Sequence, residues 1–246
     1  MAGSGADANE TAATIAADAI RRRILQQRLM PGMHVRQDEL ATELGMSRVP
    51  IREALKMLSV DGLVTYEPNR GYFVTQLSRS EMLQLYWLRE TVEDNLINTA
   101  RWPTAQELAD LEVQKQRMKR ADITVEEMVA AADAFHFAIF ALSPKHILAR
   151  EVKRWWAMST AYRALSISIH IREDRESDGD HDRFVEALSS RDRTMLLEVS
   201  RRHRETTVAR LLPILPDPGE DSTPGEPAPN RTAQADPSRH ARGARR

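Results

Sequence analysis

The feature that most constrains this chain is a pair of short helical segments, separated by a glycine break and followed at once by two β-prone runs. The segments span about residues 37–44 and 47–61, with Gly45 between them. The runs at 63–66 and 72–75 are rich in β-branched and aromatic residues, and a glycine-containing loop joins them. Helix, tight turn, helix and β-hairpin in this order predict a winged helix-turn-helix.

The second of these helices carries polar side chains where a DNA groove would meet them. Its expected buried stripe consists of Ile51, Ala54, Leu55 and Leu58. Arg48 and Arg52 are four residues apart, so they project from one face beside that stripe. The hydroxyl of Ser47 is placed to cap the helix, and guanidinium groups suit bidentate contacts to guanine edges or phosphates. In the hairpin loop, Arg70 sets a cation beside the bare backbone of Gly71, which suits close approach to a minor groove or a phosphate.

Local charge supports a nucleic-acid partner better than the charge of the whole chain does. The formal net charge is −1, which gives no general attraction to a polyanion. Residues 19–77 nevertheless hold nine basic and six acidic side chains. A small helical domain with solvated arginines is the alternative, but the arginine spacing together with the hairpin favours binding to double-stranded DNA.

The composition excludes several classes of site. The 246 residues include no cysteine, which excludes disulfides, cysteine-ligated zinc, iron–sulfur clusters and thiol nucleophiles. No apolar run reaches about 18 residues, so we expect no membrane-spanning helix. The first residues lack the basic-then-apolar pattern of a signal peptide. We therefore expect a cytoplasmic protein with no membrane partner.

The chain divides into four stretches of different character. Residues 1–13 are small and polar, and residues 214–246 are rich in proline, glycine and charge, so we expect both to be disordered. Residues 14–77 form the winged unit. Residues 78–213 show repeated helix-start signals and no strand candidate. We therefore expect a mainly α fold, with an N-terminal winged helix-turn-helix and a C-terminal all-helical bundle.

Helix starts in the second unit are marked by three capping-box patterns. They are Ser78 with Glu81, Thr104 with Glu107, and Thr124 with Glu127. Each pattern precedes an amphipathic run. Further helical runs cover about residues 145–170, 179–190 and 192–212.

Three histidines and one aspartate on these helices form a candidate metal site. If the last two runs make an antiparallel hairpin, His181 and His203 lie at similar levels, because a helix rises about 1.5 Å per residue. Asp133 and His136 are three residues apart and share one face. One carboxylate and three imidazoles suit a divalent ion such as Zn²⁺, Ni²⁺ or Mn²⁺. The spacing also allows the alternative that these are separate core or surface histidines.

The N-terminal unit resembles a known family. The run SRVPIREAL at 47–55, the DGLV turn at 61–64 and the RGYFV wing at 70–74 are similar to the DNA-binding domain of GntR-type bacterial transcription regulators. The resemblance covers about residues 19–74. It implies operator contacts from Ser47, Arg48 and Arg52 on the recognition helix and from Arg70 and Gly71 on the wing.

One position departs from that family. Fatty-acid-responsive members often carry an arginine two residues before the leucine that matches Leu40, and this chain has Asp38 there. The departure weakens the expectation of a phosphate contact at this position. Arg36 is the candidate to replace it.

The helical unit resembles the FCD effector domain, the C-terminal domain of the fatty-acid-regulator-like GntR subfamily, over about residues 80–212. The resemblance is carried by Phe-His at 135–136, His-x-x-Phe-x-x-Ala-Leu from His181, and His203. Metal-binding members of that subfamily use one aspartate and three histidines. The resemblance therefore implies His136, His181 and His203 as metal ligands.

The aspartate of that metal site does not align with the one in this chain. The family places it four residues before the first histidine, where this chain has Ala132. Asp133 is one residue late, which is about 100° round the helix. Three outcomes stay open: Asp133 reaches the metal, water takes the fourth position, or the site holds little metal.

Relatives of this domain bind small carboxylic acids beside the metal or through it. The resemblance implies a small organic-acid effector here, and guanidinium groups bind carboxylates bidentately. The candidate partners are Arg89, Arg163 and Arg172, with Arg163 preferred. The alternative is a salt bridge within the bundle, and Glu93 could simply pair with Arg89.

Together these features predict a DNA-binding transcription regulator, a repressor controlled by an effector, rather than an enzyme. We expect a homodimer, because two-fold symmetry doubles the contacts of one recognition helix. Two alternatives belong to other classes. One is a metal-dependent enzyme that uses His136, His181 and His203, against which stand the lack of a paired general acid and base and the unexplained first 77 residues. The other is a nucleoid-type protein without an effector.

Overall fold

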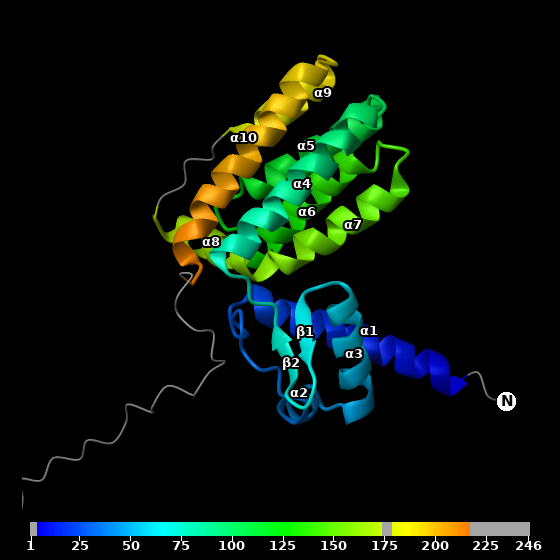
Figure 1. Ribbon diagram of the computed structural model, residues 1–246. Helices are drawn as coiled ribbons and strands as arrows, with labels where there is room; N and C mark the ends of the chain where they lie inside the picture. Colours follow the sequence, from blue (N-terminus) through cyan, green and yellow to red (C-terminus); the bar gives the residue numbers. More distant parts are fainter. Residues whose placement is uncertain (1–3, 174–178, 217–246) are drawn as a thin grey trace, which may run out of the picture.

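The computed structural model describes residues 4–173 and 179–216, with side chains at 11–169 and 179–216. The N-terminal unit consists of α1 (Ser4–Leu25), α2 (Gln37–Leu44), α3 (Arg48–Val60), β1 (Val64–Glu67) and β2 (Gly71–Val74). The C-terminal unit consists of α4 (Arg79–Thr99), α5 (Ala105–Met118), α6 (Val125–Phe140), α7 (His146–Met158), α8 (Thr160–Glu173), α9 (Asp180–Ser189), α10 (Arg193–Leu211) and the short helix η1 (Leu212–Ile214). Figure 1 shows the helical unit stacked on the smaller winged unit. The predicted fold class is confirmed.

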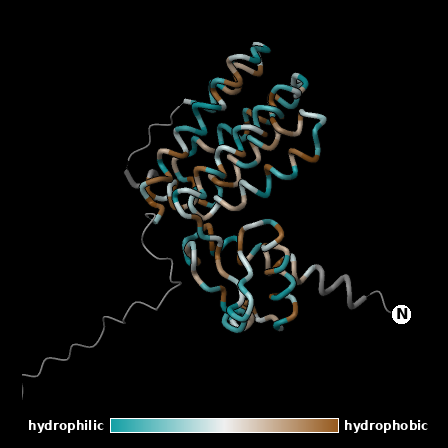
Figure 2. Tube along the Cα trace, in the orientation of Figure 1, coloured by the Kyte–Doolittle hydropathy of each residue, from teal (hydrophilic) through white to brown (hydrophobic). Residues whose placement is uncertain are grey.

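The winged unit is built round the apolar stripe of α3. Ile51, Ala54, Leu55 and Leu58 are fully buried. They belong to one cluster with residues of α1, α2 and the hairpin. The strands pair antiparallel from Val64 with Val74 to Glu67 with Gly71, whose φ of +95° favours glycine at the end of the turn. Figure 2 shows hydrophobic and hydrophilic residues alternating along the helices of both units, the pattern of helices with one buried face.

The helical unit has its own core. It is formed by residues of α4, α5, α6, α7, α9 and α10, with Phe135, Phe184 and Leu196 each almost fully buried. All three predicted capping boxes are present, at the N-termini of α4, α5 and α6. In each, the side-chain oxygen of the cap accepts from the backbone amide three residues on, and the glutamate accepts from the backbone amide of the cap. Local sequence therefore determines where these helices begin.

Three boundaries differ from the sequence predictions. The first helix begins at Ser4 rather than near residue 14, because the segment is rich in alanine, and Ala13 is already buried. The predicted run 145–170 is two helices, broken at Ser159. The disordered tail was expected to begin at residue 214, but Leu215 is 5% exposed and packs on α4 and α10. Most of the expected tail, residues 217–246, lies outside the described residues.

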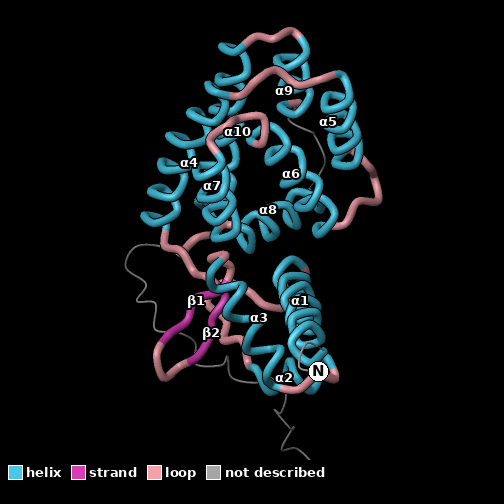
Figure 3. The backbone as a smooth tube through the Cα atoms, turned by 90° about the vertical axis from the view of Figure 1, so that its right-hand side faces the viewer, coloured by secondary structure: helices cyan, strands magenta, loops and turns pink. Residues whose placement is uncertain are grey.

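The two units are in direct contact through α8. Ala161 joins the core cluster of the winged unit, and Ala164 packs on Leu25 of α1. The hydroxyl of Tyr162 bonds to the backbone of Leu77, in the link between β2 and α4. Figure 3 shows α8 lying between the rest of the bundle and α1. Of the helices described, none is both long and apolar enough to cross a bilayer.

Candidate DNA interface and metal centre

The start of α3 presents its arginines to solvent. The side chains of Arg48 and Arg52 are 76% and 58% exposed, whereas Ile51 between them is fully buried. Ser47 occupies the N-cap position, but its side chain makes no capping hydrogen bond among the described residues, so that part of the prediction was wrong. Its hydroxyl is left exposed beside the two arginines. The burial of this stripe thus fixes the direction in which the neighbouring arginine face of α3 points.

The wing holds a second cation at its tip. The guanidinium of Arg70 lies over the ring of Phe73, with 5.0 Å between its carbon and the ring centroid. A Cβ added at Gly71 would lie 3.0 Å from Nε2 of His34, so this backbone has little room for a side chain. Arg36, the fourth predicted arginine, is exposed just before α2. DNA contact by these residues stays a prediction.

Each of the four arginines lies near a carboxylate. The Nε atom of Arg48 is 2.7 Å from Oδ1 of Asp38, and that of Arg52 is 3.8 Å from Glu53. The other two pairs are Arg36 with Glu39 and Arg70 with Glu67. Exposed ion pairs contribute little free energy, so these pairs do not prevent the arginines from reaching DNA.

Three histidines from three helices meet inside the bundle. His136 comes from α6, His181 from the first turn of α9, and His203 from α10. One nitrogen of each lies within 4.8 Å of the other two. The ring centroids are 4.9 to 5.4 Å apart. The structure therefore brings together the three histidines that the sequence singled out, and this set could hold a divalent metal.

Burial keeps two of these imidazoles neutral. Burial lowers the pKa of His181 to about 3, and electrostatic repulsion between His181 and His203 acts in the same direction. Burial likewise lowers the pKa of His136 well below its ordinary value, with smaller contributions from His203 and the nearby Arg89. The Nε2 atoms of His136 and His181 are buried and have no hydrogen-bond partner in the described part of the chain. Neutral imidazoles with unused nitrogens are the donors that a divalent transition metal takes.

The carboxylate beside this centre is not the predicted one. The group of close ligand atoms includes the three histidines and not Asp133, whose carboxylate pairs with Arg163 at 2.7 Å. Instead, Oδ2 of Asp180 lies 3.4 Å from Nδ1 of His203. Asp180 is 1% exposed at the start of α9. A carboxylate on the far nitrogen of a metal-binding histidine holds the ring in orientation.

Two of the candidate effector arginines, Arg89 and Arg163, are engaged in ion pairs inside the bundle. Arg89 pairs with Glu93 at 2.8 Å, and Arg163 with Asp133. Their guanidinium carbons lie 4.2 and 4.7 Å from the ring centroid of Trp156. The salt-bridge alternative is therefore present for both. Arg172 lies in α8, and its side chain is outside the described residues.

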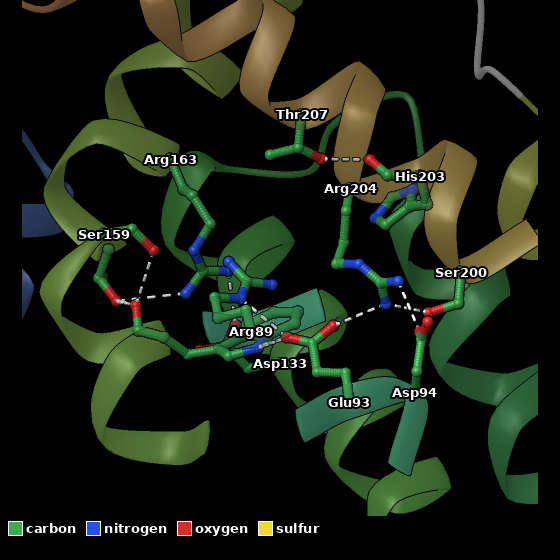
Figure 4. A network of polar contacts seen from close by, with 12 residues as sticks. Arg89, Glu93, Asp94, Asp133, Ser159, Arg163, Ser200, His203, Arg204 and Thr207 are labelled. Atoms are coloured by element: carbon green, nitrogen blue, oxygen red, sulfur yellow. Dashed lines mark hydrogen bonds and ion pairs between the residues drawn. The ribbon is translucent and has the colours of Figure 1, made fainter. Parts of the chain in front are cut away.

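Both arginines nevertheless keep an unused donor. Nη1 of Arg89 and Nε of Arg163 are buried and find no acceptor among the described residues. Figure 4 shows the surrounding network, in which Arg204 bonds to Glu93, Asp94 and Ser200. A buried donor without an acceptor is costly, so these atoms indicate where an acceptor-rich ligand would bind.

Two residues of this region were not identified from the sequence. Asp180 directly precedes His181 at a helix start, and that adjacency was the available signal. Trp156 is buried in the core of the helical unit. Its ring lies close to both arginines, and it donates its Nε1 hydrogen to Glu93 at 2.8 Å.

Two family descriptions match the chain. Residues 12–74 match the bacterial regulatory proteins of the gntR family, and residues 84–206 match the FCD domain. The second match alone covers half of the 246 residues. The two matches coincide with the winged unit and the helical unit.

Curated relatives are transcription regulators. The Nta operon transcriptional regulator of Aminobacter aminovorans is 33% identical over 125 residues, which is 50% of this chain and 60% of that protein. The repressor GlaR of Escherichia coli K12 is 26% identical over 77% of this chain and 90% of its own length. In the alignments with the Nta regulator and with a regulator of Streptomyces ambofaciens, the chain spans 60% and 53% of the relative's length.

Solved structures share the fold. McbR/YncC of E. coli superimposes with a TM-score of 0.67 at 20% identity, over 82% of this chain and 98% of that one. A GntR transcriptional regulator of Rhodococcus sp. RHA1 gives 0.67 at 22% identity, over 83% and 99%. At these identities the likeness is one of fold.

Proposed function

The chain belongs to the GntR family of bacterial regulatory proteins and carries an FCD domain, and from this premise we propose that it represses transcription from a two-fold symmetric operator until a small carboxylic acid binds. The observation that carries the DNA-binding part is the exposure of Arg48 and Arg52 on one face of α3, beside a fully buried stripe. A helix end of this kind enters a major groove with its first turns against the bases. The proposal places the protein in the cytoplasm, where bacterial DNA lies.

Selection of duplexes from a random pool by the full chain tests this function. We expect enrichment of a short inverted repeat, whose half-sites are about one helical turn apart. Binding to all duplexes alike would contradict the proposal and favour the nucleoid-type alternative. The comparisons indicate transcriptional regulators and give no support to the enzyme alternative.

The effector part of the proposal depends on the unused donors in the helical unit. Nη1 of Arg89 and Nε of Arg163 belong to guanidinium groups that both lie close to the ring of Trp156. Besides burial, the positive charges of both arginines also lower the pKa of His136. A carboxylate would supply acceptors to these donors, and it would suit a guanidinium better than a neutral ligand does. We infer that the effector is a small organic acid.

The metal part of the proposal depends on the histidine centre. His136, His181 and His203 would hold Zn²⁺, Ni²⁺ or Mn²⁺ through one imidazole nitrogen each, with Asp180 orienting His203. When bound, the ion would supply a Lewis-acid centre with positions open to a carboxylate. Calorimetry with each metal, then with candidate acids, is the direct test. Acid binding that requires neither the metal nor Arg163 would contradict this assignment.

The homodimer is also a proposal. On α4, Leu83, Trp87 and Leu88 are 48%, 64% and 39% exposed, an apolar face that a second copy would cover. Trp87→Glu should then shift the chain to monomer in analytical ultracentrifugation and weaken operator binding. A monomeric wild-type chain that still selects an inverted repeat would contradict the dimer.

A further inference from the structure

A carboxylate stands inside the face that the proposed function assigns to DNA. Asp38 lies in the first turn of α2 and is 67% exposed. Its Oδ1 atom is 2.7 Å from Nε of Arg48, at the start of α3. The contact joins the two helices of the helix-turn-helix, unlike the neighbouring pair of Arg36 with Glu39, which lies three residues apart in sequence.

This ion pair contributes little to the stability of the fold. Both side chains are mostly exposed, and solvent-exposed pairs contribute little free energy because water screens them. A negative charge at this place also opposes the approach of a phosphate backbone. The role of Asp38 is therefore more readily explained by its effect on the contact between Arg48 and DNA.

The atoms in contact indicate that effect. The carboxylate of Asp38 pairs with the guanidinium of Arg48 at Nε. A guanidinium can meet O6 and N7 of guanine through two other N–H donors, those of Nη1 and Nη2. An arginine held through Nε loses less conformational freedom when it binds a base, and it is less available to a phosphate. Resting on the proposed function, we propose that Asp38 is a positioning residue that directs Arg48 to one guanine in each operator half-site and so determines specificity.

The chain offers a matched control on the same turn of α2. Glu39 carries the same charge and the same 67% exposure, but it pairs with Arg36. Glu39→Gln therefore removes one negative charge from this helix end and leaves the contact between Asp38 and Arg48 in place. Any difference between Glu39→Gln and Asp38→Asn reports on Arg48 rather than on charge.

The experiment uses the full chain and the operator selected by the wild type. Dissociation constants are measured for that operator, for versions with each G·C pair replaced singly, and for an unrelated duplex. For Asp38→Asn we expect discrimination at one G·C pair per half-site to fall about tenfold, the scale of a lost bidentate contact. Affinity for the unrelated duplex should rise. Glu39→Gln should raise that affinity alike and leave discrimination unchanged.

A double-mutant cycle decides whether the effect runs through Arg48. In the Arg48→Ala background, Asp38→Asn should not change discrimination further. Equal effects of Asp38→Asn with and without Arg48, or equal effects of Asp38→Asn and Glu39→Gln, would overturn the proposal. A wild-type chain that selects no sequence would overturn the proposed function as well, whereas a specific wild type with unchanged discrimination in Asp38→Asn overturns this inference alone.

Discussion

The hydroxyl of Tyr162 accepts a hydrogen bond from the amide of Leu77 at 2.8 Å and donates one to its carbonyl oxygen at 3.2 Å. Leu77 lies in the link between the wing and the helical unit, and it is buried. The next residue on α8, Arg163, pairs with Asp133 beside the histidine centre. Adjacent side chains of one helix therefore contact the link between the units and the candidate effector site. A ligand that moves α8 would act on both, and by linkage DNA would alter ligand affinity by the same factor.

Tyr162→Phe should lower the stability of the chain and weaken the coupling between the two units. It leaves a buried amide and carbonyl of Leu77 without this partner, so the free energy of unfolding should fall by about 1–3 kcal/mol. The change in operator affinity caused by metal or acid should also shrink. Denaturant titration and operator titrations measure these quantities. Tyr66→Phe, at a residue 54% exposed on β1, is the control, and an equal loss in that variant would contradict the role of Tyr162.

Asp180→Asn should weaken metal binding without removing a ligand. The variant keeps the size of the side chain but loses the negative charge next to Nδ1 of His203. Loss of such a supporting group costs about 10–100-fold in metal affinity. Calorimetry with Zn²⁺, Ni²⁺ and Mn²⁺ measures it. Asp133→Asn is the comparison, because that carboxylate contacts Arg163 instead, and a larger loss there would restore Asp133 as the fourth ligand.

The buried histidines should make the stability of the metal-free chain depend on pH. The pKa of His181 is lowered to about 3, chiefly by burial, and that of His136 is lowered as well by the same cause. In the unfolded chain both titrate near 6.5, so below that pH the unfolded state binds more protons. The free energy of unfolding should therefore fall as the pH drops below about 6.5, by up to about 1.4 kcal/mol per pH unit for each histidine.

Denaturant titrations in a chelator, over that pH range, test this dependence. His181→Gln should flatten it, because one of the two groups no longer takes up a proton on unfolding. His146→Gln, at an exposed position on α7, is the matched control. An unchanged pH dependence in His181→Gln would show that His181 is not held neutral in the folded chain.

The parts that could be predicted are those set by local sequence. Gly45 and Gly71 adopt positive φ angles where the turn and the wing need them, and each capping box begins a helix. The meeting of His181 and His203 followed from their levels on a helical hairpin. The partners of Arg163 and His203 could not be predicted, because they depend on the crossing angles of helices distant in sequence. Asp133 illustrates this. It lies one residue after Ala132, the position expected for a metal ligand, and its carboxylate therefore pairs with Arg163 instead of facing the histidines.

Removal of either arginine of α3 should weaken operator binding. Arg48→Ala and Arg52→Ala should each cost about 1–3 kcal/mol and relax the preference at the base pair contacted. Arg70→Ala on the wing should reduce affinity more evenly across sequences and lower the salt slope by about 1. Gel shifts over a salt series measure both. Arg150→Ala, at a side chain 73% exposed on α7, should have no effect, and unchanged affinity in Arg48→Ala would move the interface elsewhere.

Two truncations test where the folded unit ends. Leu215 is 5% exposed and packs in a cluster with Leu77, Met82 and Leu211, all of them buried. A chain ended at Pro216 keeps that cluster, so its unfolding free energy and operator affinity should match those of the full chain. A chain ended at Leu211 loses the buried side chain of Leu215, which should cost about 1.5–3 kcal/mol. Because the same cluster contains Leu77 and Tyr162, the shorter chain should also respond less to metal or acid, and equal behaviour of the two truncations would show that η1 does not stabilise the link.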